Sequence, residues 1–119
     1  MIIRNHRLNI KGKWNSRCHF NALKLARKEG MELWVGFGVD LTYSNPGDEF
    51  RYFTHVFNMK DGIVIDNTWG AGRKLKYIYV GKKVDHKKFK SANAVWDYME
   101  AFYKPGVRSL EELDQVFQN

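Results

Sequence analysis

Cysteine and long apolar runs are scarce in this chain, and each scarcity excludes a class of protein. The single cysteine, Cys18, rules out an internal disulfide framework and is typical of a reducing compartment. No apolar run approaches the length of a transmembrane helix, and charged residues interrupt the N-terminal segment too early for a secretory signal. We therefore expect a cytoplasmic protein with no membrane segment.

Acidic residues are also in the minority, with 13 Asp and Glu against 20 Lys and Arg, which gives a net charge of +7. This excess favours acidic partners, either nucleic acid or an acidic protein. The basic clusters at 11–13, 73–76 and 82–90 are more typical of a solvated surface than of a binding site. With 119 residues, of which 44% are hydrophobic, the chain is expected to form one folded domain over residues 1–119.

The lone cysteine opens the segment around which the rest is organised, SRCHFNALKLARKEG from Ser16 to Gly30. One narrow helical stripe is expected to face the core and contains Cys18, Ala22, Leu25 and Ala26. Asn15 or Ser16 is the expected N-cap, and Gly30 the C-terminal stop. A thiol in the first turn of a helix lies where unpaired N–H groups favour a thiolate.

The remaining segments alternate between strand and helix signals. We expect an edge strand or extended arm over 1–10, a strand that the glycines allow to bulge over 32–41, and a strand over 75–80. A mobile loop is expected over 42–50 and a charged connection over 81–90. Helices are expected over 92–103 and 110–117. The clearest signal is Asp61-Gly62 between two β-rich runs, which predicts a hairpin with a two-residue turn.

The register of that hairpin places two polar residues together. Pairing Lys60 with Ile63 puts His55 and Asp66 on one face as diagonal neighbours, with Cβ atoms about 7 Å apart. Asn67 points to the opposite face. We therefore expect Asp66 to bind the imidazole of His55.

A cysteine at a helix start, a strand histidine and a carboxylate are the parts that acyl transfer requires. Cys18 would be the nucleophile, His55 the base and acid, and Asp66 the group that orients the imidazole. The backbone N–H of Cys18 and a second donor from Trp14 or Asn15 would stabilise the oxyanion. Candidates to line the cleft are Trp34, Phe37, Tyr43, Phe53 and Trp69, although aromatic residues near a sheet more often belong to the core.

Each of these residues also has a purely structural interpretation. Cys18 would serve as a small core residue, His55 as a satisfied strand histidine, and Asp66 as the start of a turn. Zinc binding by Cys18 and His19 is disfavoured, because adjacent ligands are poorly spaced and no further cysteine is present. We expect neither a metal nor a cofactor.

Two stretches resemble the transglutaminase-like superfamily. CHFNALKLARKEGMELWVGF resembles its nucleophile region, and HVFNMKDGIVIDNTW resembles its second motif, in which a strand histidine precedes a turn and an aspartate. Departures are Arg17 before the cysteine, His19 after it, and Asn67 in place of a proline. The chain is near the minimum size for this core, as in compact viral or mobile-element proteins.

The resemblance implies a papain-like α+β fold, in which a cysteine-bearing helix packs on an antiparallel sheet and further helices follow. It implies an enzyme that hydrolyses, deamidates or transamidates an amide in a protein or peptide, and it leaves open which. The alternatives are a non-catalytic basic module that binds nucleic acid or an acidic protein, and a structural or inhibitory protein with a relic triad. The sequence leaves the oligomeric state open.

Overall fold

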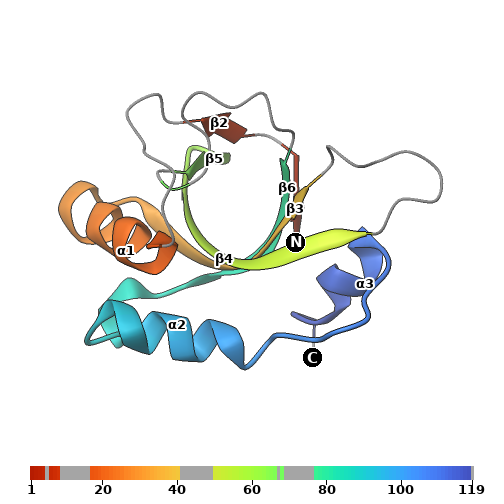
Figure 1. Ribbon diagram of the computed structural model, residues 1–119. Helices are drawn as coiled ribbons and strands as arrows, with labels where there is room; N and C mark the ends of the chain where they lie inside the picture. Colours follow the sequence, from red (N-terminus) through yellow and green to blue (C-terminus); the bar gives the residue numbers. More distant parts are fainter. Residues whose placement is uncertain (5, 9–16, 41–49, 67, 69–76, 119) are drawn as a thin grey trace.

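The computed structural model describes residues 1–4, 6–8, 17–40, 50–66, 68 and 77–118 (Figure 1). In chain order the elements are β1 (Ile2–Ile3), β2 (His6–Leu8), α1 (Cys18–Glu29), β3 (Glu32–Asp40), β4 (Arg51–Lys60), β5 (Ile63–Asp66), β6 (Tyr77–Val84), the 3-10 turn η1 (His86–Lys88), α2 (Ala92–Glu100) and α3 (Leu110–Gln115). They form an α+β domain, as the sequence predicts. The expected loop over 42–50 lies almost wholly outside the described residues.

The six strands form one sheet in the order β1-β6-β3-β4-β5-β2. Neighbouring strands are antiparallel, as expected, except for β2, which pairs with β5 in parallel. Strands β1 and β2 lie at opposite edges, yet Ile3 and His6 are only three residues apart and so at most about 11 Å apart. The two edges must therefore approach each other, and Figure 1 shows the sheet curled accordingly.

The hairpin between β4 and β5 has the predicted turn and register. Asp61 and Gly62 both adopt positive φ angles, 53° and 77°, as a two-residue turn of this kind requires. Lys60 pairs with Ile63 and Asn58 with Ile65. The local Asp-Gly signal was sufficient to fix this part of the fold.

Strand β3 is the central strand and pairs along its whole length without a bulge. Gly36 lies opposite Gly81 on β6, and a Cβ at Gly36 would lie 2.0 Å from the carbonyl oxygen of Val80. Strand β6 continues past Gly81 to Val84, so the expected connection from residue 81 was wrong there. The reason is that glycine, normally weak in a strand, is needed here for the close approach of two backbones.

Alternate residues divide between the two faces of the curled sheet. On the outer face, Leu33, Val35 and Val56 pack against α1 and α2, and a second cluster that includes Phe37 packs against residues of α3. The inner face carries a largely aromatic cluster of Ile3, Trp34, Phe57, Met59, Val64, Tyr77 and Tyr79. Phe37 is fully buried in the helix-side cluster, so of its two expected places, cleft and core, it takes the core.

Helix α1 begins at Cys18, later than the sequence predicts. Its N-cap residue is Arg17, which makes no side-chain capping bond, in place of the expected Asn15 or Ser16. Gly30 ends the helix in the left-handed conformation, with φ of 68°, as expected. The buried stripe contains Cys18, Ala22, Leu23 and Ala26, so Leu23 takes the place that the helical wheel gave to Leu25.

Candidate active site

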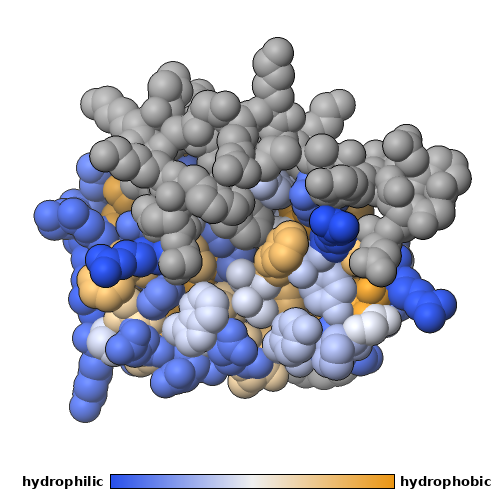
Figure 2. Space-filling model, viewed as in Figure 1, coloured by the Kyte–Doolittle hydropathy of each residue, from blue (hydrophilic) through white to orange (hydrophobic). Residues whose placement is uncertain are grey.

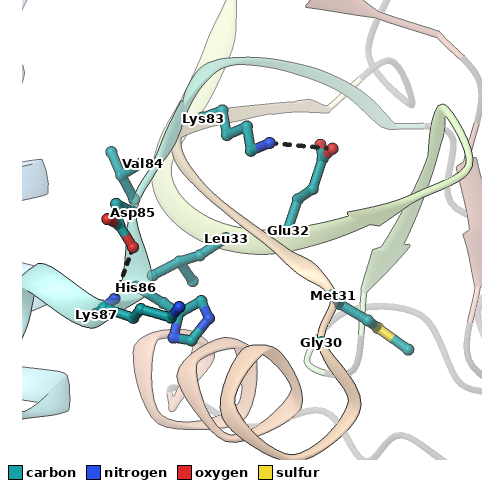
Figure 3. Close-up of a pocket in the computed structure, with 9 residues that line it drawn as sticks. All are labelled: Gly30, Met31, Glu32, Leu33, Lys83, Val84, Asp85, His86 and Lys87. Carbon is teal, nitrogen blue, oxygen red and sulfur yellow. Dashed lines mark hydrogen bonds and ion pairs between the residues drawn. The ribbon is translucent and has the colours of Figure 1, made fainter.

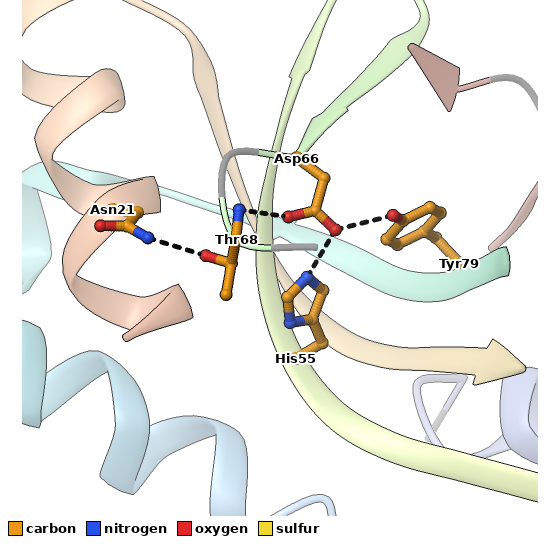
Figure 4. A network of polar contacts seen from close by, with 5 residues as sticks. All are labelled: Asn21, His55, Asp66, Thr68 and Tyr79. Atoms are coloured by element: carbon orange, nitrogen blue, oxygen red, sulfur yellow. Dashed lines mark hydrogen bonds and ion pairs between the residues drawn. The ribbon is translucent and has the colours of Figure 1, made fainter. Parts of the chain in front are cut away.

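His55 and Asp66 form a buried pair at the centre of the site. His55 lies in the middle of β4 and Asp66 at the end of β5, and their side chains are 1% exposed. The Nε2 atom of His55 lies 2.8 Å from Oδ2 of Asp66 (Figure 4). The contact predicted from the hairpin register is therefore confirmed.

Two further hydrogen bonds from described residues reach the carboxylate of Asp66 (Figure 4). The hydroxyl of Tyr79 donates to Oδ2 at 2.7 Å, and the backbone N–H of Thr68 donates to Oδ1 at 2.8 Å. Asn21 of α1 in turn donates to the hydroxyl of Thr68 at 2.9 Å. These donors fix the carboxylate in one orientation and satisfy its charge in a buried place.

Cys18 approaches the same histidine from the first turn of α1. Its thiol is reduced and buried, and it lies close enough to His55 to help raise the pKa of that side chain. Asn58 of β4 donates from Nδ2 to the carbonyl of Ala22 at 2.8 Å, which fastens the helix to the strand that carries His55. The three residues expected to carry the chemistry therefore meet, with His55 in the middle.

The surroundings of His55 favour its protonated form. Burial alone would lower the pKa of His55, but the charge and hydrogen bond of Asp66 oppose it, and those of Cys18 add to the effect. Together they raise the pKa of His55 to about 9. Burial and the neighbouring Asp66 also raise the pKa of Tyr79, which keeps its hydroxyl protonated as a donor. At neutral pH the pair is therefore an imidazolium and a carboxylate.

Tyr79 is the site residue that the sequence did not reveal. Strand β6, which carries it, is separated from β5 by β3 and β4 in the sheet order. Its hydroxyl reaches Asp66 only because the sheet curls, and the rings of Tyr79 and His55 lie 6.0 Å apart across the inner face. A tyrosine alternating with Ile78 and Val80 indicated a buried strand, but no local signal gave its partner.

Several other predicted residues lie outside the described part of the chain. These are the expected oxyanion donors Trp14 and Asn15 and the expected cleft residues Tyr43 and Trp69. Their roles stay predictions. Phe53 is 51% exposed and lies two residues before His55 on β4, so its side chain is on the same face of the strand as that of His55.

A separate hollow lies where β3 begins and β6 ends (Figure 3). It is lined by residues 30–33 and 83–87, and none of the three site residues contributes to it. An ion pair of 3.4 Å between Lys83 and Glu32 crosses it, and Trp34 donates to the same carboxylate at 3.0 Å. These contacts hold the ends of two strands together and bring no candidate nucleophile into the hollow.

Comparison of the chain with protein-family models, curated proteins and solved structures finds no match. Within the described ranges, no three His, Cys, Asp or Glu residues are grouped so that they could hold a metal ion. None of the described helices is long and apolar enough to span a bilayer. The α+β fold and the Cys18–His55–Asp66 arrangement are therefore the basis for a functional proposal.

Proposed function

We propose that this protein is a cysteine-dependent enzyme of the transglutaminase-like type, with a papain-like fold, acting on an amide in a protein or peptide. The observation that carries the proposal is the buried His55, which is hydrogen-bonded to Asp66 and lies close enough to the thiol of Cys18 for that thiol to affect its pKa. A merely structural cysteine needs no such partner, because a buried thiol is a weak donor that packs as a small apolar group.

The first half of the reaction uses each member of the triad. With Nε2 of His55 engaged by Asp66, Nδ1 is the nitrogen that would pair with Cys18, and the protonated His55 would stabilise the thiolate beside it. The thiolate of Cys18 attacks the carbonyl carbon and forms a C–S bond, while the carbonyl electrons move to the oxygen. The backbone N–H of Cys18, at the first helical position, has no partner within α1 and would donate to this oxyanion.

The intermediate then collapses. The C–N bond breaks as His55 gives its proton to the departing amine or ammonia, which leaves a thioester on Cys18. Water or a second amine loses a proton to His55 and attacks the thioester, and the C–S bond breaks. Water gives hydrolysis or deamidation, and an amine gives transamidation.

The reactivity of the single cysteine tests the proposal directly. We expect iodoacetamide to label the native protein rapidly at pH 6, at a rate at least about tenfold above that of an ordinary thiol. His55→Gln, which keeps a polar group beside Asp66, should remove this advantage, and Cys18→Ala should remove all labelling. Mass spectrometry after timed quenching between about pH 5 and 9 gives the rates.

The contrary result is a rate that rises only near the ordinary thiol pKa of about 8.5, or no labelling until the protein is unfolded in urea. Either would make Cys18 a core residue and remove the enzymatic proposal. Circular dichroism of each variant shows whether it is folded, so that a loss of labelling is not mistaken for a loss of structure.

A further inference from the structure

A second feature lies on the helical side of the molecule, where α1 and α2 pack together. A groove of about 430 Å³ runs between them, and its floor includes Leu23 and Ala92, which are almost completely buried. Phe20 also lines the groove but is 56% exposed. On the α1 side of Figure 2, small hydrophobic areas lie among hydrophilic side chains. The groove thus combines an apolar floor with an exposed aromatic ring.

Cations border this groove on both sides. Lys24 and Lys28 stand one turn apart on α1, and Lys90 lies on the opposite border just before α2. The guanidinium of Arg27 donates to the carbonyls of Phe89 and Lys90 at 3.0 and 3.3 Å, which ties the two borders together. Among the described residues that line the groove, none is acidic.

The exposed ring of Phe20 is surrounded by these positively charged side chains. The guanidinium of Arg17 lies 5.9 Å from the centre of the ring, a distance at which a cation is attracted to an aromatic face. The neighbouring cations already make this face of α1 hydrophilic, so the exposed apolar ring of Phe20 has no role in solubility. An exposed aromatic with a polar border is typical of an interaction site.

We propose that this groove binds an acidic peptide segment that carries one apolar anchor. Carboxylates of the segment pair with Lys24, Lys28 and Lys90, and the anchor packs on Phe20 and the floor. A peptide fits better than nucleic acid, because the aliphatic side chains of Leu23 and Ala92 on the floor suit an apolar anchor, and because a single exposed ring provides no stacking row for successive bases. None of Cys18, His55 and Asp66 lines the groove, so the proposal is independent of the enzymatic one.

Fluorescence anisotropy with a labelled probe peptide tests the proposal. The probe peptide has the sequence Glu-Glu-Phe-Glu-Glu, and a second probe peptide has Ser in place of Phe. At about 150 mM salt we expect Lys24→Glu/Lys28→Glu to weaken binding of the first probe by about tenfold or more, and Phe20→Ala by about fivefold. Lys60→Glu/Lys104→Glu, which makes the same change of charge at exposed positions elsewhere, should change binding less than about twofold.

Three outcomes would overturn the proposal. Equal losses in the two double variants would mean attraction to net charge alone. Equal affinity for the two probes would mean that no apolar anchor is bound. Tighter, Phe20-dependent binding of a single-stranded oligonucleotide would make the groove a nucleic-acid site. Cys18→Ala should bind the probe as the unaltered protein does, which separates this result from the fate of the enzymatic proposal.

Discussion

At the scale of single residues, the site is built outward from Asp66. Its two oxygens receive bonds from His55, Tyr79 and the backbone of Thr68, all at 2.7 to 2.8 Å. A carboxylate with this many donors stays ionised in a buried place, and it therefore holds a proton on the adjacent imidazole. The protonation state of His55 therefore depends on Tyr79 and Thr68, which act through Asp66.

Removal of one of these donors should have a measurable cost. We expect Tyr79→Phe to lower the free energy of unfolding by about 1.5–3 kcal/mol, because a hydrogen bond to a charged group is lost in a buried place. Urea denaturation at pH 7 measures this. Tyr98→Phe is the matched control, since the Tyr98 ring packs on Phe89 and Phe102 at the partly exposed surface, and it should cost less than about 0.5 kcal/mol. Equal costs would contradict a specific role for the Tyr79 hydroxyl.

At the scale of elements, two glycines decide how closely β3 and β6 approach. Gly36 and Gly81 face each other across the strand pair, and a Cβ on either would meet a backbone carbonyl of the other strand. Because His55 is the partner of Gly36 on β4, this approach occurs directly beside the site. The close approach of β3 and β6 at these two glycines therefore affects both the curvature of the sheet and the position of His55.

Gly36→Ala should be severely destabilising. The added methyl would lie 2.0 Å from the carbonyl oxygen of Val80, which is backbone and cannot rotate away. We expect a loss of at least about 3 kcal/mol in thermal or urea unfolding, or failure to fold. Gly30→Ala is the control, since its Cβ would meet nothing within 4 Å and its cost comes only from the left-handed backbone, about 1 kcal/mol. A smaller loss for Gly36 than for Gly30 would contradict the close approach.

Sequence reasoning succeeded where the signal was local. The Asp61-Gly62 turn gave a register that brought His55 and Asp66 together, and the helices expected over 92–103 and 110–117 are present, each capped by a serine hydroxyl, from Ser91 and Ser109. It failed where a partner comes from a distant strand. Tyr79 and the extension of β6 past Gly81 depend on the sheet order, which no pattern of spacing encodes.

At the scale of the whole molecule, the buried ion pair couples stability to pH. The pKa of His55 is raised to about 9 in the folded protein, against about 6.5 when unfolded, so the folded state holds the proton between these values. The stabilisation is fully present below pH 6.5 and is lost as the pH rises through 9. Linkage sets its upper limit at about 3 kcal/mol.

We therefore expect the free energy of unfolding to fall between pH 6.5 and 9, as measured by urea denaturation at several pH values. His55→Gln should flatten this dependence, since no titrating imidazole remains beside Asp66. His86→Gln is the matched control, because His86 lies in the partly exposed turn η1, and it should leave the slope unchanged. Stability that stays level or rises over this range would contradict a protonated His55.

The placement of β1 and β2 at opposite edges of the sheet has a consequence for how the chain folds during synthesis. Residues 1–8 are synthesised before their hydrogen-bonding partners on β6 and β5, which lie more than 50 residues later in the chain. The sheet can close only after β6 has emerged, and such non-local pairing is slow. Asp66 gains the Tyr79 hydroxyl at that same late step, so the polar site is completed only when nearly all of the sheet has been made.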